Sequence, residues 1–287
     1  MPRCFFVSDL HGKLERYQKL FELIAKAKPQ VVFIGGDILP LSAANLSSNS
    51  SSSDSFIEGY LAEKLLYLQL ELKDEYPRVF IIMGNDDVRS EEIALMSGAA
   101  KGIWEYAHNN KFQLGRWQVY GYAFVPPTPF QLKDWERYDV SRYVDPGCFS
   151  PEYGRHTVPV PENELRYSTI KKDLEVLTGD DDLKQAIFLF HSPPYKTNLD
   201  RAALDGRTID HAPLDLHVGS VAMRRFITAR QPMLTLHGHV HESARLTGSW
   251  QDKIEATYMF TAAHDGPELA VVQFDPADLT RATRMLI

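Results

Sequence analysis

Cysteine is scarce in this sequence, which has only Cys4 and Cys148 among 287 residues. Two cysteines this far apart do not provide the framework of several disulfides that stabilises many small secreted domains. Cys4 falls within an apolar run, where a small core residue is expected. The scarcity of cysteine therefore favours a reducing compartment.

Long apolar runs and an excess of basic charge are also missing. No apolar run reaches the roughly 20 residues that span a bilayer, and the N-terminus lacks the apolar region of a signal peptide. We therefore expect a soluble, cytoplasmic protein without a membrane partner. The net charge of −7 argues against a nucleic-acid-binding surface, because contacts with phosphates need a basic face.

Short apolar runs alternate with helical patterns along most of the chain. Strands are predicted at residues 3–8, 31–34, 79–83, 112–125, 186–190, 233–236, 257–260 and 269–274. Helices are predicted at residues 13–27, 56–76, 91–98, 162–177 and 218–230. This alternation indicates an α/β fold with a largely parallel sheet, and residues 112–125 suggest a second, more antiparallel one. The length allows one large domain or two, and we expect a single domain over residues 1–287.

Three segments carry no clear strand or helix pattern. Residues 41–55 are rich in serine and are expected to form a mobile surface loop, and residues 200–217 are expected to form a plain loop. Residues 126–161 are rich in proline, aromatic and charged residues, and are too long for a simple connection, so we expect a lid or a substrate-shaping insertion. Its candidate stacking residues are Trp135, Tyr138, Tyr143 and Tyr153. A small hydrophobic core that holds the insertion together is the favoured role for these aromatics.

Metal-type ligands follow five of the predicted strands. Asp9 and His11 are two residues apart, so in an extended backbone their side chains point the same way. The full set of donors is Asp9, His11, Asp37, Asn85, His191, His239 and His241. In open α/β sheets, binding sites form outside the carboxyl ends of the strands, so we expect these seven side chains to meet at one edge.

Seven oxygen and nitrogen donors are more than one catalytic metal needs. A mononuclear zinc hydrolase would use three or four of them and leave the rest unexplained. Two adjacent ions, ~3.5–4 Å apart and sharing one carboxylate, fit the number better, and such sites hydrolyse phosphate esters. The set contains no thiolate, which suits two Mn, Fe or Zn ions better than Cu(I) or a structural zinc.

The order of these motifs resembles that of the calcineurin-like metallophosphoesterases. The matching motifs are DLH at Asp9–His11, GGD ending at Asp37, GNDD at Gly84–Asp87, HSPP from His191 and GHVH at Gly238–His241. The resemblance covers residues 9–241 and implies the fold of that family, a four-layer α/β sandwich with two mixed β-sheets.

The resemblance also implies a role for each donor. Asp9, His11 and His241 would hold one ion. Asn85, His191 and His239 would hold the other. Asp37 would bridge the two ions, and a metal-bridging hydroxide would attack phosphorus in line and hydrolyse a P–O bond.

Asp86 departs from the family pattern, which commonly has a histidine here that is thought to protonate the leaving group or to orient the phosphate. An aspartate beside two cations is biased to stay ionised and is therefore a poor general acid. It also repels a dianionic phosphomonoester more than a monoanionic diester, which favours phosphodiesters. We take Asp86 and His239 as candidate catalytic residues, whereas Asp87 matches a carboxylate whose usual role in the family is structural.

Several alternatives stay open at this point. A phosphomonoesterase, including a protein Ser/Thr phosphatase, is the second candidate for a small phosphoester substrate. A non-catalytic binding scaffold on the same fold is the rival from another class, and the retention of all seven donors counts against it. His237 is either a residue that orients a ligand or a buried structural histidine. Arg89, close to Asn85 in sequence, is a candidate contact for phosphate, and the oligomeric state is left open.

Overall fold

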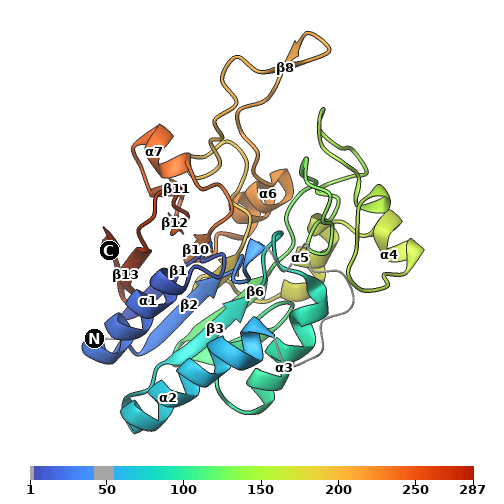
Figure 1. Ribbon diagram of the computed structural model, residues 1–287. Helices are drawn as coiled ribbons and strands as arrows, with labels where there is room; N and C mark the ends of the chain where they lie inside the picture. Colours follow the sequence, from blue (N-terminus) through green and yellow to red (C-terminus); the bar gives the residue numbers. More distant parts are fainter. Residues whose placement is uncertain (1–2, 42–54) are drawn as a thin grey trace.

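Two six-stranded mixed sheets form the centre of the protein (Figure 1). The structure is a computed structural model and describes residues 3–41 and 55–287. In spatial order, the first sheet contains β14 (Asp278–Leu286), β13 (Ala270–Asp275), β1 (Cys4–Val7), β2 (Val31–Gly35), β3 (Arg78–Ile82) and β4 (Glu105–Tyr106). The second contains β11 (Gln251–Ile254), β12 (Thr257–Thr261), β10 (Leu234–His237), β7 (Ala186–Phe190), β6 (Trp117–Tyr122) and β5 (Lys111–Leu114). The two mixed sheets predicted from the resemblance are confirmed.

Helices cover the outer sides of the two sheets. Figure 1 shows α1 (Leu14–Ala27), α2 (Glu63–Leu72) and α3 (Glu92–Ala100) beside the first sheet. On the other side lie α5 (Ile170–Thr178) and α6 (Val221–Arg230), which contact each other. Two further helices are short, α4 (Glu162–Tyr167) and α7 (Ser243–Thr247). No helix in the described ranges is both long enough and apolar enough to cross a membrane.

Continuous apolar runs explain why the central strands lie inside the molecule. Every residue of β1, β2 and β7 is buried, as expected for parallel strands that are covered on both faces. Aromatic pairs join the two sheets: Phe80 of β3 lies 5.6 Å from Phe112 of β5, and Phe260 of β12 lies 6.0 Å from Phe274 of β13, measured between ring centroids. The core is therefore shared by both sheets.

The strand directions bring five strand ends to one edge. In the first sheet β1, β2 and β3 run parallel, and in the second sheet β7 runs parallel to β10. Backbone hydrogen bonds continue beyond the strands, because Asp9 N–H donates to the Gly36 carbonyl (3.0 Å) and Gly238 N–H donates to the His191 carbonyl (2.9 Å). The loops that carry the predicted donors are thus fixed to one another.

The structure corrects several details of the predicted elements. The predicted helix at 162–177 is two helices, α4 and α5. The backbone is extended at Thr169, whose side chain caps α5 by accepting a hydrogen bond from Lys172 N–H. The predicted loop at 200–217 contains a short hairpin of β8 (Thr208–Ile209) and β9 (Ala212–Pro213). Strands β4, β11 and β14 were not predicted. Residues 42–54 of the predicted serine-rich loop lie outside the described residues.

The aromatic residues of the insertion at 126–161 do not form the separate small core favoured from the sequence, because Trp135 belongs to the main hydrophobic core. Trp135 is fully buried, with its ring 5.5 Å from that of Phe124 and 5.0 Å from that of His108, and Tyr138 is also buried. Tyr143 and Tyr153 are exposed instead. Trp135 therefore packs against residues outside the insertion, whereas the hydroxyl of Tyr138 bonds to Ser150 and Glu152 within it.

Hydrogen bonds attach the insertion to the rest of the structure at several places, which include Asp134 and Asp139. The buried Asp134 accepts from Arg89 N–H (2.8 Å), three residues beyond Asp86. The half-buried Asp139 accepts from Ser220 Oγ (2.5 Å) and Val221 N–H (2.7 Å) at the N-terminus of α6. The insertion therefore contacts elements on both sides of the strand ends.

The contact between Asp139 and α6 gives a stability prediction. Replacing Asp139 by Ala leaves the half-buried N–H of Val221 without its acceptor, and an unmet donor shielded from water costs about 1–3 kcal/mol. We expect the free energy of unfolding of D139A, measured by urea denaturation, to fall by that amount. The control is D180A, because Asp180 is exposed. Equal stability of the two variants would show that the insertion is not anchored through Asp139.

Candidate metal centre

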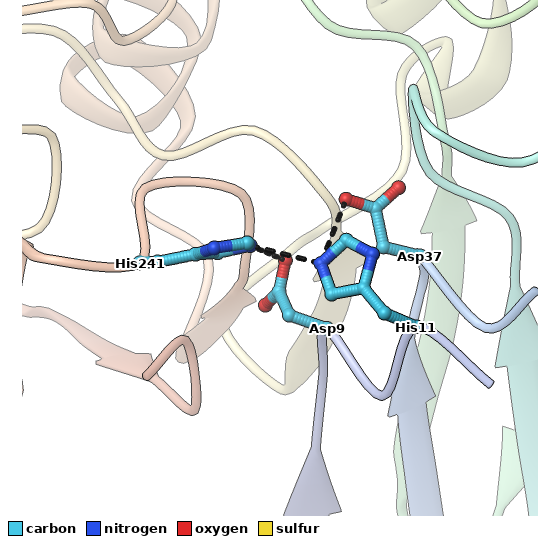
Figure 2. Close-up of side chains that lie close together, drawn as sticks. All are labelled: Asp9, His11, Asp37 and His241. Atoms are coloured by element: carbon cyan, nitrogen blue, oxygen red, sulfur yellow. Dashed lines mark hydrogen bonds and ion pairs between the residues drawn. The ribbon is translucent and has the colours of Figure 1, made fainter. Parts of the chain in front are cut away.

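Four of the predicted donors form one compact group (Figure 2). Asp9, His11, Asp37 and His241 each offer a ligand atom, and these atoms all lie within 4.8 Å of one another. His241 Nε2 lies 3.2 Å from Asp9 Oδ1 and 3.1 Å from His11 Nε2. His11 Nε2 lies 3.8 Å from Asp37 Oδ2. The first and last motifs of the chain therefore meet at the end of β1.

The other three donors form a second group that also approaches Asp37. Asn85 Oδ1 lies 3.1 Å from His191 Nε2 and 2.6 Å from His239 Nδ1. His191 Nε2 also lies 3.3 Å from Asp37 Oδ2. His191 Nδ1–H donates to the Gly35 carbonyl (2.7 Å), which turns Nε2 toward the other donors. All seven predicted donors are thus close together, and Asp37 is common to both groups.

The backbone is strained where it presents these side chains. Asp9, His11, Asp37 and His239 have positive φ angles of 57°, 47°, 51° and 73°. Residues with a Cβ seldom adopt this conformation, which costs on the order of 1–3 kcal/mol each and is typical of ligand clamps. The strain is held in part by a hydrogen bond from His11 N–H to the Asp37 carbonyl (2.7 Å). Four of the seven donors therefore depend on support from their surroundings.

Two glycines make the close approach of the loops possible. A Cβ on Gly36, whose φ is +96°, would lie 2.7 Å from His191 Nδ1 and 2.7 Å from the Met83 carbonyl. A Cβ on Gly84 would lie 2.3 Å from Asp37 Oδ1. Such separations are too short for a carbon atom, so these positions need glycine.

Buried charges set the protonation of the donors. Burial raises the pKa of Asp37, but the charge and hydrogen bond of His191 lower it to about 2. Burial also raises the pKa of Asp9, but the hydrogen bond and charge of His241 hold that pKa far below its ordinary value. Burial lowers the pKa of His191 and His241, but neighbouring carboxylates raise these values to about 10 and about 9. Burial and the charge of His191 lower the pKa of His239 to about 3.

Asp86 lies beside both groups of donors. Its N–H donates to Asp37 Oδ1 (2.9 Å), its Oδ1 accepts from Asn85 Nδ2 (3.0 Å), and its Oδ2 lies 3.8 Å from His11 Nδ1. Burial and the carboxylates of Asp37 and Asp87 raise the pKa of Asp86 to about 8. The raised pKa of Asp86 differs from the ionised state expected from the sequence. That expectation included the field of two cations, which would lower the pKa.

Asp87 has the structural environment expected for it. Its buried carboxylate accepts hydrogen bonds from the backbone N–H groups of Leu39 (2.8 Å), Ile38 (3.1 Å) and Gly84 (2.8 Å). These bonds tie the loop after β3 to the loop after β2. Asp87 therefore fixes the loops that carry Asp37 and Asn85.

His237 supports the backbone beside a donor. It is fully buried, and burial lowers its pKa to about 3, so the ring is neutral. Its Nδ1–H donates to the Ser192 carbonyl (2.9 Å), and its Nε2 accepts from Thr235 Oγ1 (2.7 Å). His237 is therefore a buried structural histidine that holds the segment directly after His191.

Arg16 is a supporting residue that the sequence analysis missed. It is buried, with Nη1 donating to the Asp9 carbonyl (2.6 Å) and Nη2 donating to the Gly266 carbonyl (2.5 Å). The signal was its position on the buried face of a predicted amphipathic helix, four residues before Leu20. Arg16 thus ties the strained backbone of Asp9 to a loop near the C-terminus.

Arg89 is already engaged by other groups. Its Nε lies 3.1 Å from Glu92 Oε2, and its guanidinium carbon lies 5.3 Å from the ring centre of Trp135. Its proposed contact with phosphate is therefore not supported by the geometry. Arg89 instead connects the loop after β3 with Trp135 of the insertion.

Comparisons with known proteins agree with this arrangement. The sequence profile of the calcineurin-like phosphoesterases matches residues 2–243. No curated protein gives a significant sequence match. Among solved structures, TT1561 of Thermus thermophilus is similar at 15% identity, with a TM-score of 0.52 and coverage of 99% of this chain and 98% of that chain. A dimetal phosphatase from Danio rerio is similar at 12% identity, with a TM-score of 0.50 and coverage of 99% and 98%. At these identities the two structures show a shared fold.

The family match extends over most of the chain and includes all seven donors. The described fold, with two mixed sheets and helices on their outer sides, agrees with it. The chain therefore belongs to the calcineurin-like phosphoesterase family and is a metal-dependent phosphoester hydrolase.

Proposed function

We propose that this protein hydrolyses small phosphodiesters at a centre of two divalent cations. Asp9, His11 and His241 would hold one cation, and Asn85, His191 and His239 would hold the other. Asp37 would be shared between the two. The observation that carries the proposal is the position of Asp37, whose Oδ2 lies 3.8 Å from His11 Nε2 in one group and 3.3 Å from His191 Nε2 in the other.

The residues fit divalent cations in chemistry and in unmet bonding. Asp9 Oδ2 is buried and has no hydrogen-bond partner among the residues described. A buried acceptor without a partner is costly, and a cation would satisfy it. The donors are carboxylate, amide and imidazole groups without a thiolate, which suits Mn, Fe or Zn. Loading would also release the protons that the carboxylates retain on His191 and His241.

Bound cations would lower the pKa of a water molecule and neutralise charge on the phosphoryl oxygens. The protein's own contribution is to fix the donors and to set the net charge of the centre. An ionised Asp86 would add a negative charge that the more common histidine does not carry. Its repulsion of a dianionic monoester would be about twice its repulsion of a monoanionic diester at the same distance, which supports the preference for diesters.

We propose that the insertion shapes the substrate site within one domain. Asp134 fixes the backbone of Arg89, which follows the Asn85–Asp86 segment, and Asp139 fixes the start of α6. We therefore include residues 126–161 in a single catalytic domain over residues 1–287. A cytoplasmic location is part of the same proposal, supported by the scarcity of cysteine.

The shared role of Asp37 predicts the effect of a single substitution. D37N removes the negative charge common to both cations, so metal content and hydrolytic activity should be lost together. Metal content is measured by mass spectrometry after loading with Mn²⁺ and desalting. D180N makes the same chemical change at an exposed residue and should keep both properties. Retention of two metals and full activity by D37N would exclude a shared carboxylate.

The charge of the centre predicts which generic substrate is preferred. Metal-stripped protein, resupplied with Mn, Zn, Fe or Mg in turn, should hydrolyse bis(p-nitrophenyl) phosphate faster than p-nitrophenyl phosphate at equal concentration. A preference for the monoester would leave the enzyme class intact and overturn the charge argument. Folded, metal-loaded protein with no turnover of either compound would favour the binding scaffold.

A further inference from the structure

We propose that Asp86 is a positioning residue that orients one ligand of each cation, namely Asn85 and His11. The inference rests on the two-cation centre proposed above. It assigns to this side chain a role other than proton donation. The argument has three parts, which concern the amide of Asn85, the imidazole of His11 and the backbone of Asp86 itself.

The first contact selects the orientation of the Asn85 amide. An asparagine ligates a cation through its oxygen and turns its NH₂ group the other way. Asn85 Nδ2 donates to Asp86 Oδ1 (3.0 Å), and Asn85 Oδ1 faces His191 Nε2 (3.1 Å) and His239 Nδ1 (2.6 Å). Because Asp86 accepts a hydrogen bond from the NH₂ group, the amide oxygen of Asn85 points toward His191 and His239.

The second contact selects the tautomer of His11. Its Nε2 faces the donor group, at 3.1 Å from His241 Nε2, so a cation-binding His11 carries its proton on Nδ1. His11 Nδ1 is buried and has no hydrogen-bond partner in the described part of the chain. Asp86 Oδ2 lies 3.8 Å from it, within ion-pair range but beyond a direct hydrogen bond. At this distance no direct hydrogen bond forms, and the negative charge of the carboxylate favours the proton on the facing Nδ1 of His11.

The third contact fixes Asp86 with respect to the shared carboxylate. Its backbone N–H donates to Asp37 Oδ1 (2.9 Å), so residue 86 contacts the shared donor and one ligand of each group. Both of its side-chain oxygens face ligands. A histidine at this position has at most one acceptor nitrogen and cannot serve two donors at once. The aspartate is thus suited to a double role that the more common residue cannot perform.

Two variants separate the two contacts, and the readout is Mn²⁺ binding to metal-stripped protein measured by titration calorimetry. D86A removes both acceptors and should weaken both Mn²⁺ sites by roughly 10–100-fold, the usual effect of losing such a partner. D86N keeps an oxygen for the Asn85 amide but turns an NH₂ group toward His11. It should therefore weaken one site by the same factor and leave the other near the wild-type affinity.

The controls distinguish failure of this inference from failure of the two-cation centre. Binding of fewer than two Mn²⁺ ions by the wild-type protein would refute the centre itself. Two wild-type sites that keep their affinities in D86N and D86A would refute only the positioning role. Equal weakening of both sites by D86N would also refute it, because the two contacts would then not be separable. D180N controls for the substitution, and circular dichroism checks the folding of the nearly isosteric D86N.

Discussion

The buried carboxylate of Asp37 is the group on which the rest of the site depends. It lies at the end of β2, where strand ends from both sheets meet, and its Oδ2 faces one histidine from each group of donors. Its buried negative charge and its hydrogen bond favour the protonated form of His191 and raise the pKa of that imidazole. The two sheets supply the scaffold, and the charge at their junction determines what can bind there.

Holding so many polar groups together has a structural cost, and the surrounding residues offset it. Backbone strain at Asp9, His11, Asp37 and His239 opposes folding, while buried hydrogen bonds restrain the same loops. Arg16 also restrains these loops, because its guanidinium group donates a hydrogen bond to the Asp9 carbonyl. Packing of the aromatic core between the two sheets stabilises the fold and offsets that strain.

Much of this arrangement could be predicted because strand ends are visible in sequence. Apolar runs followed by ligand-type residues located the seven side chains that lie close together, and the resemblance supplied the grouping proposed for them. The break before Thr169 could not be predicted, since a local side-chain cap overrode a continuous helical pattern. The orientation of the Asn85 amide and the burial of Arg16 depend on residues far away in sequence, and no local pattern encodes such contacts. The path of the insertion could not be predicted either, because it also depends on contacts between residues far apart in sequence.

The most direct test of the central claim is anomalous X-ray scattering from crystals of the Mn²⁺-loaded protein. The account predicts two anomalous peaks, roughly 3.5–4 Å apart, on either side of the Asp37 carboxylate. Asn85 and His191 should contact one peak, and Asp9 and His241 the other. A single peak, or a second peak away from Asp37, would contradict a centre built on a shared carboxylate.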